Sequence, residues 1–166
     1  MKHVISVTVE NKPGVLARVS SMFARRGFNI HSLTVGPTED PTLSRMTVVV
    51  DGPEMEQIVK QLYKLVHTVK VTEYGPGEAI EREIMLVRVN ADAKRRGEIL
   101  DAARVCEAKA VDVGAASITF EMTGTPDRLA DFLQLMSTYG IVALAKSGRI
   151  ALARDQKTLK KSQKSA

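Results

Sequence analysis

Apolar and polar residues alternate along residues 3–10 (HVISVTVE), and this period of two predicts a β-strand. After Pro13 the period becomes that of an amphipathic helix, whose apolar face would hold Val15, Leu16, Val19, Met22 and Phe23. Gly27 follows and predicts the end of this helix, one position after its C-cap. Strands are then expected at 28–36 and 43–51, a second helix at 53–66 and a closing strand at 67–74. The predicted order is therefore βαββαβ.

The same order returns after a linker with Gly and Pro at residues 75–79. Strands are predicted at 82–91, 109–116 and 117–124, helices at 93–108 and 125–139, and one long or broken closing strand at 141–154. Thr125 as N-cap, Pro126 at the first helical position and Gly140 after the end mark the last helix. Two such halves predict an α+β protein with two ferredoxin-like domains in tandem, at residues 1–76 and 80–154, followed by a basic tail at 155–166.

Each predicted sheet carries its helices on one face, which leaves the other face bare in a monomer. Residues 46–51 (MTVVVD) place valines on both faces of their strand. We therefore expect another sheet or strand edge to cover that face, most simply in a two-fold dimer.

The net charge of +5 lies mainly in the tail, because residues 154–166 hold five basic residues and one acidic residue. The tail is predicted to be disordered, and the rest of the chain carries only +1. Aromatic residues make up 4% of the chain, without the interleaved run typical of an RNA-binding sheet. Composition thus gives little support for a nucleic-acid partner.

No apolar run approaches the roughly 20 residues of a membrane span, and the first residues alternate at once, so neither a membrane segment nor a leader peptide is predicted. A single cysteine, Cys106, excludes an internal disulfide and favours a cytoplasmic protein; we interpret it as a buried structural thiol. His3, His31 and His67 share no metal-ligand spacing. No catalytic motif is present, and we expect no metal site and no catalytic activity from this chain alone.

The start of the first helix is the chemically distinctive feature. Pro13 at the first helical position would make Lys12 the N-cap, and lysine cannot accept a hydrogen bond. The N–H groups of Gly14, Val15 and Leu16 would then be free to bind an anion, such as the carboxylate of an amino acid. Asn11 could accept from an ammonium group or donate to a carboxylate. Alternatively, Asn11 is itself the N-cap, and Gly14 only sets the helix start.

Residues 9–52 resemble the ACT domain of the small, regulatory subunit of acetolactate synthase (acetohydroxyacid synthase). Its most specific block is RRGFNIHSLTVGPTEDPTLSRMT at residues 25–47. The resemblance continues through 57–73, 81–91, 108–124 and 139–154, so it covers about residues 2–154. It departs from the family at Cys106, where the family usually has a large apolar residue.

The resemblance implies a partner, the separate large subunit, which condenses two 2-oxo acids with thiamine diphosphate, Mg²⁺ and FAD; no cofactor is expected on this chain. The small subunit would raise the activity of the large one and confer inhibition by a branched-chain amino acid, usually valine. The effector would lie between two ACT domains of a homodimer. One protomer would contribute Asn11, Gly14, Val15 and Leu16, and the other Asn29 and Ile30.

Other functions remain open on the sequence alone. They are another amino-acid-sensing ACT protein, a ferredoxin-like RNA-binding protein, and a small enzyme of the acylphosphatase type, for which no phosphate loop is visible. The loop at residues 37–45 is either a docking site for the large subunit or a plain solvated loop.

Overall fold

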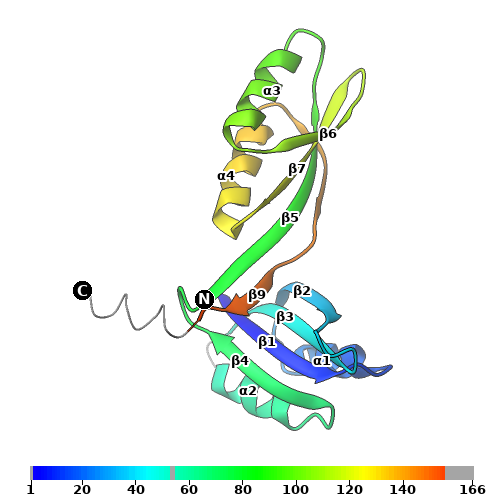
Figure 1. Ribbon diagram of the computed structural model, residues 1–166, viewed down its shortest axis with the longest axis vertical. Coiled ribbons are helices and arrows are strands. Elements are labelled where there is room, and N and C mark those ends of the chain that lie inside the picture. Colours follow the sequence, from blue (N-terminus) through cyan, green and yellow to red (C-terminus); the bar gives the residue numbers. More distant parts are fainter. Residues whose placement is uncertain (1, 53–54, 156–166) are drawn as a thin grey trace, which may run out of the picture. The chain divides into compact units, whose positions relative to one another are not determined.

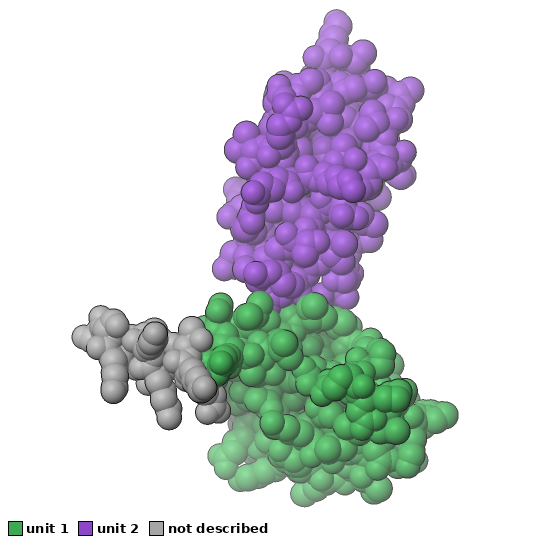
Figure 2. Space-filling view, in the orientation of Figure 1, with its two compact units in different colours: residues 1–80, 149–166 green, residues 81–148 purple. Residues whose placement is uncertain are grey.

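The computed structural model describes residues 2–52 and 55–155 and shows two compact units (Figure 1). Unit 1 comprises residues 1–80 and 149–166, and unit 2 comprises residues 81–148 (Figure 2). The predicted tail lies outside the described residues from residue 156 onward. No helix in the two described ranges combines the length and hydropathy that a membrane span requires.

Unit 1 has the predicted βαββαβ order. Its elements are β1 (Lys2–Glu10), α1 (Val15–Arg25), β2 (Ile30–Pro37), β3 (Leu43–Asp51), α2 (Met55–Tyr63) and β4 (Thr68–Tyr74) (Figure 1). The sheet order is β2-β3-β1-β4, so β2 and β4 form its edges. The inward side chains of β1 and β3 pack against both helices, around Phe23, Ile58 and Leu62. The second helix is shorter than predicted, and residues 53–54 of the predicted span are outside the described ranges.

Unit 2 repeats the arrangement. Its elements are β5 (Ala79–Asn90), whose first two residues belong to unit 1, α3 (Arg96–Val105), β6 (Lys109–Val113), β7 (Ser117–Gly124), α4 (Pro126–Ser137) and β8 (Ile141–Lys146). Four strands of the five-stranded sheet lie in the order β6-β7-β5-β8, and the fifth, β9 (Ile150–Ala153), also pairs with β5. Phe120 of β7 and Phe132 of α4 meet edge to face at 6.1 Å in the core, the geometry that aromatic pairs prefer.

The closing strand predicted at 141–154 is broken, one of the two forms expected, and its two parts fall in different units. Residues 141–154 form two strands, separated at Gly148, whose φ of +82° suits glycine. The second strand, β9 (Ile150–Ala153), belongs to unit 1 rather than to the C-terminal domain. Ala151 packs there with Ala79 against Val4 and Val49, and all four side chains are buried.

This packing corrects the expectation of a bare sheet face in unit 1. Val4 and Val49 lie on the face without helices, since their neighbours Ile5 and Val48 point into the helix-side core. The chain itself covers this part of the face. In unit 2 the corresponding face leaves Ile84 and Leu86 exposed, at 40% and 42%.

The ends of two helices confirm the local predictions. Gly27 has a φ of +72° and donates to the Ala24 carbonyl at 3.1 Å, so it follows the C-cap of α1 as predicted. The Thr125 hydroxyl accepts from the Arg128 N–H at 3.4 Å, and Pro126 begins α4.

Candidate functional site

The loop between β1 and α1 is held by bonds to its neighbours. The Asn11 N–H donates to the Thr42 carbonyl at 2.7 Å, and Asn11 Nδ2 donates to the Pro41 carbonyl at 3.1 Å. The Glu10 N–H donates to the His67 carbonyl at 2.9 Å. The loop is therefore positioned by the β2–β3 loop on one side and by the turn before β4 on the other.

The β2–β3 loop is itself built around Asp40. The Thr42 hydroxyl and N–H donate to Asp40 Oδ1 at 2.6 and 2.9 Å. These bonds stabilise the charged carboxylate and lower the pKa of Asp40, the hydroxyl bond contributing most. This support was not predicted from the sequence, although an aspartate two residues before a threonine is a signal for such a turn.

Glu10 neutralises the lysine of the loop. Its carboxylate lies 2.5 Å from Lys12 Nζ and 3.1 Å from His67 Nδ1. The hydrogen bond from Lys12, followed by that from His67, lowers the pKa of Glu10. The charge of Lys12 is thus already matched within the loop.

Gly14, not Lys12, is the N-cap of α1, and its φ is +81°. The expected cap at Lys12 is wrong because the left-handed turn at Gly14 starts the helix later, leaving Pro13 outside it. The alternative that Asn11 caps the helix is also wrong. No side chain accepts a hydrogen bond at this cap, and the Asn11 amide bonds to Pro41 instead.

The helix start keeps unpartnered backbone donors. In residues 2–52 and 55–155, no hydrogen bond involves the N–H groups of Gly14, Leu16 and Ala17. The Val15 N–H, predicted to be free, makes a long 3.4 Å bond to the Lys12 carbonyl. The first turn of α1 contains no acidic residue to offset the helix dipole. This end of α1 therefore has the chemistry to accept an anion.

The side chains at the helix start differ in exposure. Leu16 is 43% exposed and available for an apolar contact. Val15 is only 5% exposed and belongs to the core of unit 1, so it offers a ligand much less side-chain surface than Leu16 does.

Asn29 and Ile30 lie at the opposite end of the sheet. Ile30 pairs with Val50, whereas Leu43, seven residues earlier on β3, pairs with Glu10 beside the loop between β1 and α1. At about 3.3 Å per residue, the two ends are about 23 Å apart. Asn29 is exposed, and Ile30 is half-buried against the core. One chain does not bring together the six predicted residues.

The three histidines are each paired with a carboxylate. His3 lies 2.9 Å from Glu73, His67 pairs with Glu10, and His31 pairs with Asp51. The described residues contain no group of His, Cys, Asp or Glu side chains that could hold a metal ion. Cys106 is half-buried against the core of unit 2.

Both halves of the chain match family models. Residues 5–70 match an AHAS small subunit-like ACT domain, and residues 82–155 match the small subunit of acetolactate synthase.

Similar proteins share nearly the whole length. The chain is 51% identical over 159 residues to a probable acetolactate synthase small subunit of Archaeoglobus fulgidus, covering 95% of this chain and 99% of that protein. It is 50% identical over 155 residues to the acetolactate synthase small subunit of Mycolicibacterium smegmatis, covering 92% and 91%. The crystal structure of the small subunit from Thermotoga maritima superposes with a TM-score of 0.86 at 39% identity, covering 94% of this chain and 99% of that one.

Proposed function

Because the chain belongs to the family of acetolactate synthase small subunits, we propose that it activates a catalytic large subunit and confers feedback inhibition by valine. The large subunit would carry thiamine diphosphate, Mg²⁺ and FAD, and both would act in the cytoplasm. The observation that supports the valine site is the start of α1, which has no side-chain cap, unpartnered N–H groups and a left-handed Gly14 as N-cap.

The backbone of this loop suits the charged groups of an amino acid. The carboxylate would accept hydrogen bonds from the Gly14, Leu16 and Ala17 N–H groups at the positive end of the helix dipole. An added Cβ at Gly14 would meet no atom within 4 Å, so this side of the loop is open to a ligand. Since Asn11 Nδ2 already donates to Pro41, the Asn11 amide oxygen would accept from the ammonium group.

A two-fold dimer would supply the remaining residues. Strand β2 is an edge of the unit 1 sheet, and an edge strand can pair with its copy. In an antiparallel β2–β2 pair, the start of the partner's strand lies beside the end of this one. Asn29 and Ile30 of one chain would then approach the start of α1 in the other chain. The dimer would thus bring together residues that lie at opposite ends of the sheet within one chain.

Inhibition follows if the dimer, or its attachment to the large subunit, has two arrangements that bind valine unequally. A ligand shifts an equilibrium only by the difference in its affinity for the two states. A site shared between chains senses their arrangement directly, because its two halves separate when the chains move.

Calorimetry of the purified chain with valine, leucine and isoleucine tests the proposed site. Gly14→Asp should abolish valine binding, because its carboxylate competes for the same N–H groups and repels the ligand carboxylate. Gly27→Asp is the matched control, since Gly27 has a similar φ of +72° and equally open surroundings. Unchanged valine affinity in a folded Gly14→Asp chain would show that the site lies elsewhere. Valine should differ in affinity from leucine and isoleucine, since each of these has one more methylene, which is worth about 1–3 kcal/mol in such a pocket.

A further inference from the structure

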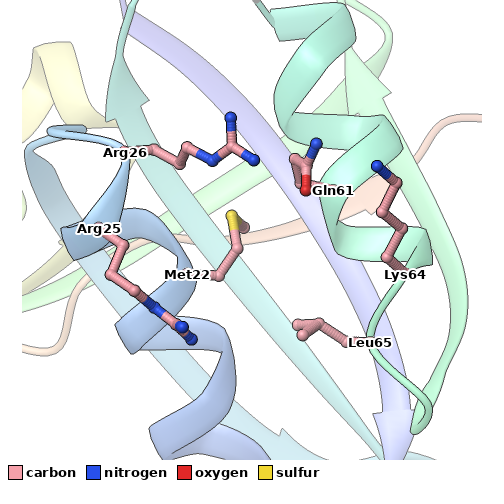
Figure 3. A pocket seen from close by; sticks show the side chains of 6 residues that line it. All are labelled: Met22, Arg25, Arg26, Gln61, Lys64 and Leu65. Carbon is pink, nitrogen blue, oxygen red and sulfur yellow. The ribbon is translucent and has the colours of Figure 1, made fainter.

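A hollow in unit 1 lies between α1 and α2. Its volume is about 260 Å³, and it is lined by Met22, Arg25, Arg26, Gln61, Lys64 and Leu65 (Figure 3). None of these residues belongs to the proposed valine site. We refer to it as the cationic pocket.

Three of its six lining residues are cations, and none is acidic. In the described part of the chain, no carboxylate pairs with Arg25, Arg26 or Lys64, although Arg25 Nε donates to the Ser21 carbonyl at 3.3 Å. Other cations of unit 1 do have acidic partners, such as Lys60 with Glu56 at 2.7 Å. Among the described residues of unit 1, no carboxylate therefore balances the positive charge around the cationic pocket.

The floor of the pocket is apolar. Met22 is 7% exposed and belongs to the core, and Leu65 packs against the same core. Figure 3 shows the Met22 and Leu65 side chains between the two helices, with the Arg26 guanidinium directed toward the Gln61 amide. A cationic rim above an apolar floor matches an acidic side chain that carries or adjoins an apolar group.

The pocket is less suited to a free inorganic anion. Its polar groups are side chains, and the three cations are exposed, so an anion would have to order them. Arg25 and Arg26 lie at the C-terminal end of α1, and Lys64 follows the last residue of α2. The helix dipoles there oppose any negative charge, so a bound carboxylate needs contacts beyond its charge. A protein segment adds apolar contacts and buried area that a small anion lacks.

We infer that the cationic pocket docks an acidic segment of the catalytic large subunit, with a carboxylate held by Arg26 and Lys64. The inference rests on the proposed function, which supplies the large subunit as partner. Charge complementarity selects this occupant, since the rim offers cations without carboxylates. A purely structural role, in which the cations only offset the helix dipoles, would affect stability but not docking.

The test titrates the full chain into its cognate large subunit and measures the concentration that gives half-maximal activation. Arg26→Gln/Lys64→Gln should raise this concentration roughly tenfold, because two charge-assisted contacts are lost. Arg18→Gln/Lys70→Gln is the control: it removes the same charge from exposed positions outside the pocket and should change the value by less than about twofold. Calorimetric valine affinity should be unchanged in both.

Gln61→Glu provides an independent variant with nearly the same shape. Its carboxylate would occupy the cationic pocket from within the chain and should also weaken docking. Circular dichroism and thermal unfolding of each variant confirm that it is folded before titration.

If the pocket and control variants raise the concentration for half-maximal activation equally, docking depends on net charge alone, and the inference is overturned. Undiminished activation by the pocket variant, with or without measurable binding of inorganic phosphate to the wild-type chain, would also overturn it. A wild-type chain that does not bind the large subunit at all would overturn the proposed function and the docking inference together.

Discussion

Gly14 and Gly27 flank α1 with left-handed backbones, at φ +81° and +72°, and an added Cβ would meet no atom within 4 Å at either. Alanine at either position should destabilise the chain by roughly 1–2 kcal/mol, because the strain is in the backbone alone. Gly97→Ala inside α3 is the opposite case, with open space and no left-handed φ, and should stabilise by about 0.5–1 kcal/mol. Denaturant unfolding measures the free energy of unfolding of all three alanine variants. An equal change at the three positions would contradict the argument from backbone strain.

These two glycines show what a sequence reveals about single residues. Gly27 was predictable because a glycine directly after an amphipathic stripe is a common helix end. The role of Gly14 was not, because Pro13 has its own preference for the first helical position and the two signals compete. The hydrogen bonds from Asn11 to Pro41 and Thr42 join residues about 30 apart in sequence, so no local sequence pattern predicts them.

Among the elements, the β2–β3 loop depends on the charge of Asp40. The lowered pKa of Asp40 means that the folded chain holds this carboxylate ionised more strongly than the unfolded chain does. The resulting stability is present above the ordinary aspartate pKa of 3.8 and is lost as the pH falls through the lower pKa of the folded chain. The stability lost in Asp40→Asn should therefore be greatest near neutral pH and should shrink in acid, as measured by denaturant unfolding at several pH values.

Glu39→Gln is the control for this loop. Glu39 is adjacent to Asp40 in sequence but makes no hydrogen bond or ion pair among the described residues. It should change stability little at any pH. A stability difference for Asp40→Asn that stays constant into acid would show that its charge does not support the turn.

The β2 edge is where we expect two chains to meet. Val35 on β2 is 41% exposed, so Val35→Glu should leave the monomer folded but weaken the dimer by burying a charge at the junction. Val69→Glu on the opposite edge strand, β4, is the matched control at 53% exposure. Sedimentation of both variants, with valine calorimetry beside it, checks the prediction. Dissociation by the β4 variant alone would place the dimer contact on the other edge.

Sequence periodicity specified some elements better than others. The bounds of β3 and β7 agree with the predicted strands at 43–51 and 117–124, because their alternation runs unbroken between turn residues. The packing of β9 against unit 1 could not be predicted from the sequence pattern. It depends on contacts of Ala151 with Val4 and Val49, which are far away in sequence. Small apolar residues at a chain's end do not reveal which sheet they cover.

At the scale of the whole molecule, a complementation test is possible because each proposed valine site takes Asn11 from one chain and Asn29 from the other. Asn11→Ala and Asn29→Ala dimers should each bind valine more weakly, by about 1–3 kcal/mol where a buried polar group loses its partner. A mixed dimer of the two variants should regain one site of wild-type affinity and leave one doubly impaired. Calorimetry of co-refolded chains gives the stoichiometry, and a mixture with no tight site would contradict a site shared between chains.

Regulation of acetolactate synthase, without catalysis by this chain itself, is the role on which the other proposals depend. The most direct test of that role is to reconstitute the purified chain with its cognate large subunit and to measure acetolactate formation as valine is added. We expect no product from the chain alone, a higher turnover when it joins the large subunit, and loss of that turnover as valine is added. Turnover by the chain alone, or a reconstituted enzyme that ignores both the added chain and valine, would refute this role.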